Sequence, residues 1–555
     1  MKNLLPSGLV LAVALASLAD GPADNVAEKV RPIPPPGIAV PEKDRAELQA
    51  GLGALGREIE ALRAAPARQA SLLPDVEILH KAVRYALEGG EFFKTNEIRS
   101  AKDLLKLGME RAAQLRAGTA PWLTSTGLVV RGYRSRIDGS VQPCGLVVPP
   151  APAGGAARRL DLWLHGRGET LSEVNFLAGR LKDPGQFTPP GAIVLHVYNR
   201  YCNAARFAGE TDVFEAMDLV RRTYPVDPDR IVVRGFSMGG ASCWGLATHH
   251  AWMWAAAAPG AGFSETADFL KVFQDETLRP SPWEQTLWRL YDATEHAANV
   301  FNVPLVAYSG EVDRQKQAAD MMEKAMAAEG LALTHIIGPA TAHKYEPGAR
   351  AKVEAFVDAA AAKGRDPLPP KVRFTTFTLR YNRMAWVVVD ALERHWERAR
   401  VDAELDSREQ TVRATTKGVA ALSFVFDPGR MPFGGKAPIA IVLDGQVLAP
   451  PRGFAETRAA HFRRAADGWE AVAAVDTASL AKRHGLQGPI DDAFMDSFLF
   501  VRPTGPAMNA NVAAWAASEM DRAVREWRRQ FRGDARVKDD AAVTDADIAA
   551  HNLVL

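Results

Sequence analysis

Residues 231–240 read IVVRGFSMGG, and the fold assignment starts from this stretch. Its β-branched beginning is typical of a buried strand, and the following residues 241–246, ASCWGL, are typical of a helix. A Gly-x-Ser-x-Gly turn between a strand and a helix predicts a nucleophile elbow, a tight turn that holds its serine in strained backbone angles. The glycines of the stretch leave room for this turn. Ser237 is therefore the candidate nucleophile, and the alternative is a tight turn with an incidental serine.

A serine hydroxyl is a weak nucleophile and needs a neighbouring base, which an acid in turn orients. In nucleophile-elbow proteins the acid follows the serine along the chain, and the histidine comes last. The apolar run at residues 303–308 predicts a buried strand, and Ser-Gly-Glu-Val-Asp follows it. Asp313 is the candidate acid and Glu311 is its alternative, although Asp313 could instead cap the next helix.

The candidate base is His343, in the loop after the last predicted core strand, residues 334–339. A helix predicted to begin at Pro347 follows this loop, which is where the base of such a fold belongs. His335 is the alternative, but its position within the strand predicts that it points into the packing of the sheet.

The fourth predicted part is the sequence Leu-His-Gly-Arg-Gly at residues 164–168, directly after a predicted strand. Backbone N–H groups at Gly166 and Arg167, together with that of Met238, are expected to form an oxyanion hole for the negative charge that develops on the substrate. The Arg167 side chain is also a candidate contact to an anionic substrate group, with a plain surface arginine as the alternative. Tyr201 is the second candidate substrate contact.

Apolar runs alternate with helical stretches through the middle of the chain, which indicates a parallel sheet covered by helices on both faces. Two earlier runs, at residues 128–130 and 146–148, predict an opening antiparallel pair. The predicted parallel strands are residues 160–164, 193–197, 231–233 and 304–308. The expected fold class is α/β, with a doubly wound, mostly parallel sheet.

With these motifs in place, the chain resembles the α/β-hydrolase superfamily, and more closely the exported bacterial proteins described as prolyl-oligopeptidase-like (S9-type). The motifs RGFSMGG, YSGExD and AHKY carry this resemblance, which is specific over residues 160–360. It implies the roles of nucleophile, orienting acid and general base for Ser237, Asp313 and His343. True prolyl oligopeptidases also carry a β-propeller, whereas the residues before 160 are partly helical and too few for seven four-stranded blades.

The resemblance leaves the substrate open, because one triad cleaves both esters and amides. The elbow also resembles those of secreted feruloyl, acetyl-xylan and polyhydroxybutyrate esterases. We expect a serine hydrolase acting on a small ester, a peptide or a glycan-linked acyl substrate. The alternative is a non-catalytic binding protein with a hydrolase-shaped domain.

Changes in composition divide the chain into six predicted segments. Lys2, the apolar run at residues 9–18 and the small residues before position 20 are typical of an export signal, with an uncleaved anchor or buried helix as the alternative. We therefore expect a secreted or periplasmic protein. The segments are a signal peptide (1–19), a Pro-rich linker (20–42), a helical region (43–120), an α/β-hydrolase catalytic domain (121–363), a mostly β accessory domain (371–475) and a mixed α/β region (476–555). The apolar last residues, 552–555, favour a fragment of a longer protein.

Composition argues against several other classes of function. The formal charge is +1 and basic residues are scattered, which argues against nucleic-acid binding. No apolar run is long enough for a membrane span, and no spacing predicts a metal site or cofactor. The three cysteines are too few for a disulfide framework; a bridge between Cys202 and Cys243 is one possibility and free buried thiols are the other. The oligomeric state is not indicated.

Overall fold

The structure is a computed structural model that describes residues 32–273, 277–433, 439–451 and 453–555. The predicted signal peptide, residues 1–19, lies outside the described residues, as does the predicted linker up to residue 31. The described end of that linker contacts the body of the protein. The Ile38 N–H donates to the Phe92 carbonyl at 2.6 Å, and Arg529 Nε donates to the Ile33 carbonyl at 2.9 Å.

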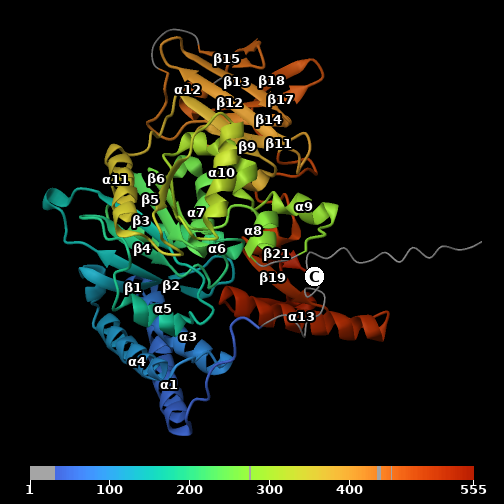
Figure 1. The fold of residues 1–555 in the computed structure, drawn as a ribbon. Coiled ribbons are helices and arrows are strands. Elements are labelled where there is room, and N and C mark those ends of the chain that lie inside the picture. Colours follow the sequence, from blue (N-terminus) through green and yellow to red (C-terminus); the bar gives the residue numbers. More distant parts are fainter. Residues whose placement is uncertain (1–31, 274–276, 434–438, 452) are drawn as a thin grey trace, which may run out of the picture.

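An eight-stranded sheet forms the centre of the molecule, in the strand order β1-β2-β4-β3-β5-β6-β7-β8 (Figure 1). The opening strands β1 and β2 are antiparallel, β2 pairs antiparallel with β4, and the other neighbours are parallel. This confirms the predicted fold class, an α/β-hydrolase with a mostly parallel sheet. The strands are β1 (Gly127–Arg134), β2 (Val141–Val148), β3 (Arg158–Leu164), β4 (Ile193–Val197), β5 (Val226–Phe236), β6 (Ala256–Gly260), β7 (Val306–Gly310) and β8 (Thr334–Gly338).

Helices cover both faces of this sheet. Strand β5 therefore carries apolar residues on both of its sides. Val232 packs in the cluster formed with α11 (Pro347–Lys363), whereas its neighbour Val233 lies in the main core. Successive side chains of a strand point to opposite faces, so both residues need an apolar partner. The other helices of this region are α5 (Glu173–Arg180), α6 (Ala208–Thr223), α7 (Met238–His249), α8 (Thr266–Phe273), α9 (Pro282–Trp288) and α10 (Lys316–Ala328).

The amino-terminal helices pack against the β1–β2 end of the sheet, at the bottom of Figure 1. Asp75, the second residue of α3, holds this contact: its carboxylate accepts from Arg131 Nε at 2.9 Å, from the Gly132 N–H at 2.7 Å and from Trp122 Nε1 at 2.9 Å. The helices are α1 (Glu42–Arg63), α2 (Ala67–Ser71), α3 (Pro74–Gly89) and α4 (Thr95–Arg116).

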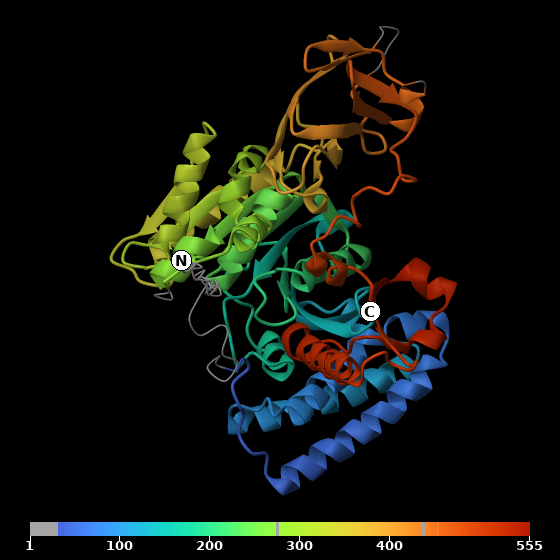
Figure 2. The same ribbon diagram turned by 90° about the vertical axis from the view of Figure 1, so that its right-hand side faces the viewer.

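Two five-stranded sheets follow, and they project from the rest of the molecule (orange in Figure 2). Their strand orders are β10-β11-β14-β17-β18 and β16-β15-β13-β12-β9, so the residues predicted to be mostly β are strands. The elements are β9 (Lys371–Thr376), β10 (Arg383–Met384), β11 (Val387–Leu392), β12 (Ala399–Asp406), β13 (Thr411–Lys417), β14 (Val419–Val425), β15 (Ala440–Leu443), β16 (Gln446–Leu448), α12 (Phe454–Thr457), β17 (Ala459–Ala465) and β18 (Gly468–Val472).

The carboxyl-terminal part packs against the region of the eight-stranded sheet. The carboxyl end of its long helix α13 (Ala510–Phe531), where an amphipathic helix is predicted, contacts the loop between β4 and α6 (Figures 1 and 2). A small parallel sheet, β20-β19-β21, lies next to it. The remaining elements are β19 (Phe498–Arg502), β20 (Val537–Asp539), α14 (Asp545–Ala550) and β21 (Asn552–Val554). Of the helices in the described ranges, none has the length and apolar character needed to cross a bilayer.

Candidate active site

Ser237 lies between β5 and α7 with φ 59° and ψ −122°, a combination that non-glycine residues rarely adopt. Two backbone hydrogen bonds fix it there. The Ser237 N–H donates to the Gly260 carbonyl at 2.9 Å, and the Ser237 carbonyl accepts from the Ala241 N–H at 3.1 Å. The neighbouring strand β6 and the first turn of α7 thus hold the strained turn, as the sequence predicts for a nucleophile elbow.

The glycines of the elbow are required by close approach of backbone. A methyl group added at Gly239 would lie 1.9 Å from the Leu164 carbonyl oxygen, and one at Gly235 would lie 2.0 Å from the Gly239 oxygen. At Gly240 it would lie 2.2 Å from the Gly260 oxygen. Real side-chain carbons do not approach oxygen this closely, so only glycine lets β5 and α7 meet at this angle.

The candidate base and acid are paired. His343 Nδ1 lies 2.8 Å from Asp313 Oδ2, and the Gln315 N–H donates to Asp313 Oδ1 at 2.9 Å. The Asp313 side chain is 4% exposed, whereas that of His343 is 39% exposed. A proton on Nδ1, donated to the carboxylate, leaves Nε2 free to accept one from a nucleophile.

The loop that carries His343 lies against the elbow. The His343 ring is 4.9 Å from the ring of Phe236, the residue before Ser237. Gly310 makes this possible, because a methyl group there would lie 2.3 Å from the carbonyl oxygens of Thr341 and Ala342. In the described residues no hydrogen bond joins Ser237 Oγ to His343, and such bonds are often long before substrate binds.

The two alternatives from the sequence have other partners. Glu311 Oε2 accepts from the Ala340 N–H at 2.7 Å and so holds the loop rather than the imidazole. His335 Nε2 lies 3.0 Å from Ser309 Oγ, and burial lowers the pKa of His335. Its position in the sheet packing is the one predicted. The geometry therefore favours Asp313 and His343 as the acid and the base.

The predicted oxyanion loop lies beside the elbow. Met238 is the first residue of α7, so its N–H belongs to the helix end that has no acceptor within the helix. A methyl group placed on Gly166 would lie 3.4 Å from the Ser237 Cβ, which shows how near the loop passes. His165 fixes that loop, with Nδ1 2.8 Å from the Gly166 oxygen and Nε2 2.9 Å from the Tyr198 oxygen.

A pocket of about 740 Å³ opens at Ser237. The pocket lining includes the candidate site residues Ser237, Met238 and Arg167. The Arg167 guanidinium also pairs with the Glu169 carboxylate at 2.9 Å. The other lining residues are Cys202, Asn203, Ala204, Arg206, Phe207, Phe263, Phe269, Gln315, Gln530 and Phe531. The last two come from the end of α13, far away in sequence.

Comparison with known proteins finds a family to which the central part of the chain is similar. Residues 208–360 match the family model described as Prolyl oligopeptidase family (Peptidase_S9). These residues are thus similar to this family. The match spans the elbow, Asp313 and His343, and it confirms the resemblance seen in the sequence. A search of the curated proteins found no match.

Several solved structures are similar to parts of the chain. A Mycobacterium tuberculosis puromycin-hydrolyzing peptidase is 16% identical, over 43% of this chain and 40% of that chain, with a TM-score of 0.33. A Staphylococcus aureus S-formylglutathione hydrolase is 16% identical, over 42% of this chain and 98% of its own, with a TM-score of 0.32. A Pyrococcus horikoshii acylaminoacyl peptidase is 15% identical, over 44% and 43%, with a TM-score of 0.33. The chain spans about two fifths of the length of both peptidases.

Tyr201 is the candidate site residue whose position differs from the prediction. Its side chain is 1% exposed, its hydroxyl donates to the Glu169 carbonyl, and the Arg532 guanidinium lies 4.1 Å from its ring centre. Because protein atoms cover the ring, Tyr201 supports the loop beside the pocket and does not contact substrate.

Three further residues line the pocket that the sequence analysis did not single out. The Arg206 guanidinium lies between two rings, 4.7 Å from the centre of Tyr291 and 5.3 Å from that of Phe263, and burial lowers its pKa. Gln530 and Phe531 reach the pocket only because α13 folds back onto the catalytic region. Arg206 lies between β4 and α6 next to Phe207, which is a weak sequence signal. Gln530 has no such signal.

The cysteines and the predicted absence of metal complete the comparison with the sequence. Cys144, Cys202 and Cys243 are free thiols, so the bridge considered between Cys202 and Cys243 is not formed. Asp320, Glu323 and His335 bring one possible ligand atom each within 4.8 Å of one another, a cluster that the sequence did not indicate. Both carboxylates are exposed, and such surface groups are common without a metal.

Proposed function

We propose that the protein is an exported serine hydrolase that cleaves ester or peptide bonds through an acyl-enzyme. The observation that carries this proposal is the His343–Asp313 pair, 2.8 Å apart, on a loop that packs against the elbow of Ser237. The pocket at Ser237 gives a carbonyl substrate access to that serine. A catalytic unit at residues 121–363, with the helical, β and mixed α/β segments appended to it, is part of the proposal.

The chemistry follows from the positions of these groups. Ser237 Oγ attacks the substrate carbonyl carbon while its proton passes to His343 Nε2, and Asp313 stabilises the imidazolium that forms. The N–H of Met238 and those of the loop at Gly166 and Arg167 stabilise the oxyanion. His343 then gives the proton to the leaving alcohol or amine. Water repeats the sequence on the acyl-enzyme and releases the acid.

The alternatives differ in the leaving group. A carboxylesterase of the feruloyl, acetyl-xylan or polyhydroxybutyrate type uses the same residues as a peptidase, and a non-catalytic binding protein would use none of them. A panel of p-nitrophenyl esters beside aminoacyl-p-nitroanilides separates esterase from peptidase. The ratio of kcat/KM for the esters to kcat/KM for the anilides shows which class of bond the protein cleaves faster.

A fluorophosphonate probe tests whether the protein is an enzyme at all. We expect the native protein to be labelled at Ser237 and the Ser237→Ala variant to remain unlabelled. Absence of label on the folded native protein would favour the binding protein. Export is tested separately: the amino-terminal sequence of protein recovered from the periplasm or the medium should begin after residue 19.

A further inference from the structure

A second cavity adjoins the pocket at Ser237. It has a volume of about 240 Å³ and is lined by Phe207, Asp491, Phe494, Phe500, Ala523, Glu526, Trp527, Gln530 and Phe531. Phe207, Gln530 and Phe531 also line the pocket at Ser237, so these residues, called the wall below, border both spaces. The rings of Phe207 and Phe531 meet edge to face, with their centres 6.5 Å apart.

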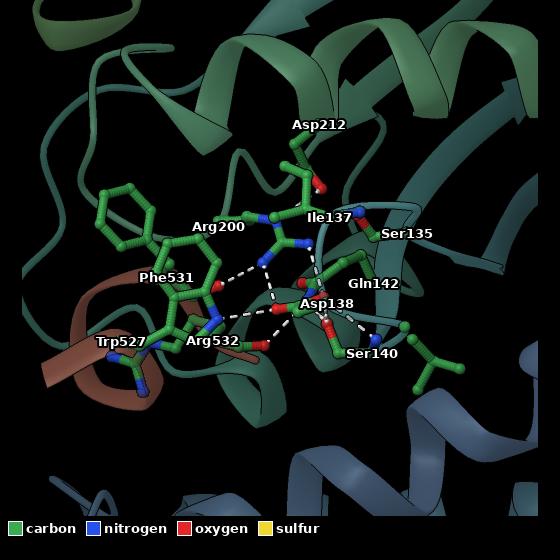
Figure 3. Close-up of polar contacts among 12 residues, drawn as sticks. Ser135, Ile137, Asp138, Ser140, Gln142, Arg200, Asp212, Trp527, Phe531 and Arg532 are labelled. Atoms are coloured by element: carbon green, nitrogen blue, oxygen red, sulfur yellow. Dashed lines mark hydrogen bonds and ion pairs between the residues drawn. The ribbon is translucent and has the colours of Figure 1, made fainter. Parts of the chain in front are cut away.

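The position of the wall is fixed, because side chains around the eight-stranded sheet donate hydrogen bonds to the end of α13. Asn203 Nδ2 donates to the Gln530 carbonyl at 2.9 Å, Arg200 Nη1 to the Phe531 carbonyl at 3.0 Å, and Gln142 Nε2 to the Arg532 carbonyl at 2.8 Å. Carbonyl groups at the end of a helix have no N–H donor within the helix, and these side chains supply one instead. Figure 3 shows Arg200, Gln142 and the carboxyl end of α13 converging on one another.

A buried ion pair fixes the same place. Arg200 Nη1 lies 2.9 Å from Asp138 Oδ2, both side chains are 0% exposed, and Trp527 Nε1 donates to the same Asp138 oxygen at 2.9 Å (Figure 3). Burial alone would raise the pKa of Asp138, but the contacts with Arg200, Ser140 and Trp527 outweigh it and hold the pKa well below its ordinary value. The carboxylate therefore stays charged and keeps Trp527 and Phe531 in position.

We propose that the second cavity binds an apolar group of the substrate, an aromatic ring or a short branched chain, while the scissile carbonyl lies at Ser237. Aromatic rings make up most of its lining, and its volume exceeds the cavity of about 150 Å³ that holds benzene in another protein. The carboxylates of Asp491 and Glu526 disfavour an anionic group there. The substrate role of the cavity rests on the proposed function, whereas the cavity itself does not.

The first test fills the cavity from α13. Ala523→Phe places a ring in it, and Ala517→Phe, at an exposed position of the same helix, is the matched control. The readout is the kcat/KM ratio of a phenylacetyl or a benzyl ester to the corresponding acetyl or methyl ester, so that both the acyl and the alcohol side are covered. In one of the two series we expect a preference for the aromatic substrate that Ala523→Phe lowers at least tenfold and Ala517→Phe keeps within twofold.

A second variant, which enlarges the cavity, distinguishes a change in selectivity from a general loss of the fold. Phe494→Ala enlarges the cavity and should shift the preference toward longer chains, by about fourfold for each additional methylene that becomes buried. Equal ratios in Ala523→Phe and Ala517→Phe, or no aromatic preference in either series, would overturn the proposal.

The second test does not depend on turnover. Calorimetric titration of the Ser237→Ala variant with benzyl alcohol should show binding that the added Ala523→Phe substitution weakens at least tenfold. Binding of benzyl alcohol without hydrolysis of any ester would overturn the proposed function and leave the cavity as a ligand site. Hydrolysis whose selectivity does not respond to Ala523→Phe would overturn the substrate role of the cavity and leave the hydrolase in place.

Discussion

Two regions of this molecule bring a serine, a histidine and an aspartate close together. In the region of the eight-stranded sheet His343 pairs with Asp313 beside the elbow of Ser237. In the β region Ser423, on β14, donates to the Asp390 carboxylate, and its Oγ lies 2.6 Å from His461 Nδ1. The same three residue types are thus assembled twice.

The order of contacts differs between the two regions. At Ser423 the serine lies in the middle and bonds both partners, so no base is oriented by an acid. Ser423 lies on a regular strand directly opposite His461 and is 1% exposed, whereas Ser237 has strained backbone angles and lines a pocket. The comparison teaches that the same three residue types occur with and without the strained turn and the acid–base order that the proposed mechanism requires.

The largest expected difference between the two regions appears when each serine is replaced by alanine in turn. Ser237→Ala should lower kcat by on the order of 10⁶, because the nucleophile is lost, while circular dichroism shows an unchanged fold. Ser423→Ala should retain the activity and lower the free energy of unfolding by about 1–2 kcal/mol, since two polar partners lose their bridge. A loss of turnover in Ser423→Ala that matches that of Ser237→Ala would contradict the assignment.

The next test concerns the acid. Asp313→Asn should lower kcat by about 10⁴, because an amide no longer fixes the imidazole tautomer. Glu311→Gln keeps an oxygen for the Ala340 N–H and should change kcat less than tenfold. Steady-state kinetics on one p-nitrophenyl ester is sufficient, and a reversed order would move the acid to Glu311.

The requirement for glycine at the elbow can be tested by substituting alanine at two glycines of α7. Gly239→Ala places a methyl group 1.9 Å from the Leu164 oxygen and should cost about 3 kcal/mol of stability, with kcat lowered by about 10². Gly245→Ala in α7 meets no atom within 4 Å and should raise the free energy of unfolding by about 0.5–1 kcal/mol. Denaturant unfolding measures both, and equal effects would argue against a backbone requirement at the elbow.

The smallest expected effect is a pH dependence in the β region. Burial raises the pKa of Asp390 above its ordinary value of 3.8, while Ser423 and His461 partly offset it. A carboxyl group whose pKa is raised by folding contributes most below the unfolded pKa, and that contribution is lost as pH rises through the folded pKa. The melting temperature of Asp390→Asn, relative to the unchanged protein, should therefore increase between pH 4 and pH 7; a constant difference would show that the carboxyl group does not titrate in this range.

The sequence predicts the fold of the catalytic region and the partners of Ser237 because each lies at the end of a strand. A strand, a turn and a helix are local patterns, and the chain order of serine, acid and histidine then orders them in space. Strand β6 is an exception. Its alanines have little preference for strands, and the neighbouring strands β5 and β7 decide its conformation.

The remainder of the site depends on contacts that no local pattern reveals. Tyr201 follows a core strand, where a substrate contact is plausible, but Arg532 from the far end of the chain covers its ring. Phe531 lines the pocket because Arg200 donates a hydrogen bond to its carbonyl at the end of α13, and these residues are 331 positions apart. Hydrophobic periodicity identifies α13 as an amphipathic helix and cannot say against which surface it packs.

The capping of α13 has a consequence for the time course of synthesis. The last helix of the catalytic sheet ends at Lys363, and the wall residue Phe531 leaves the ribosome much later. At ordinary rates of translation this interval is on the order of ten seconds. The chain therefore contains Ser237 and its proposed partners before it contains the wall residues to which we assign the choice among substrates.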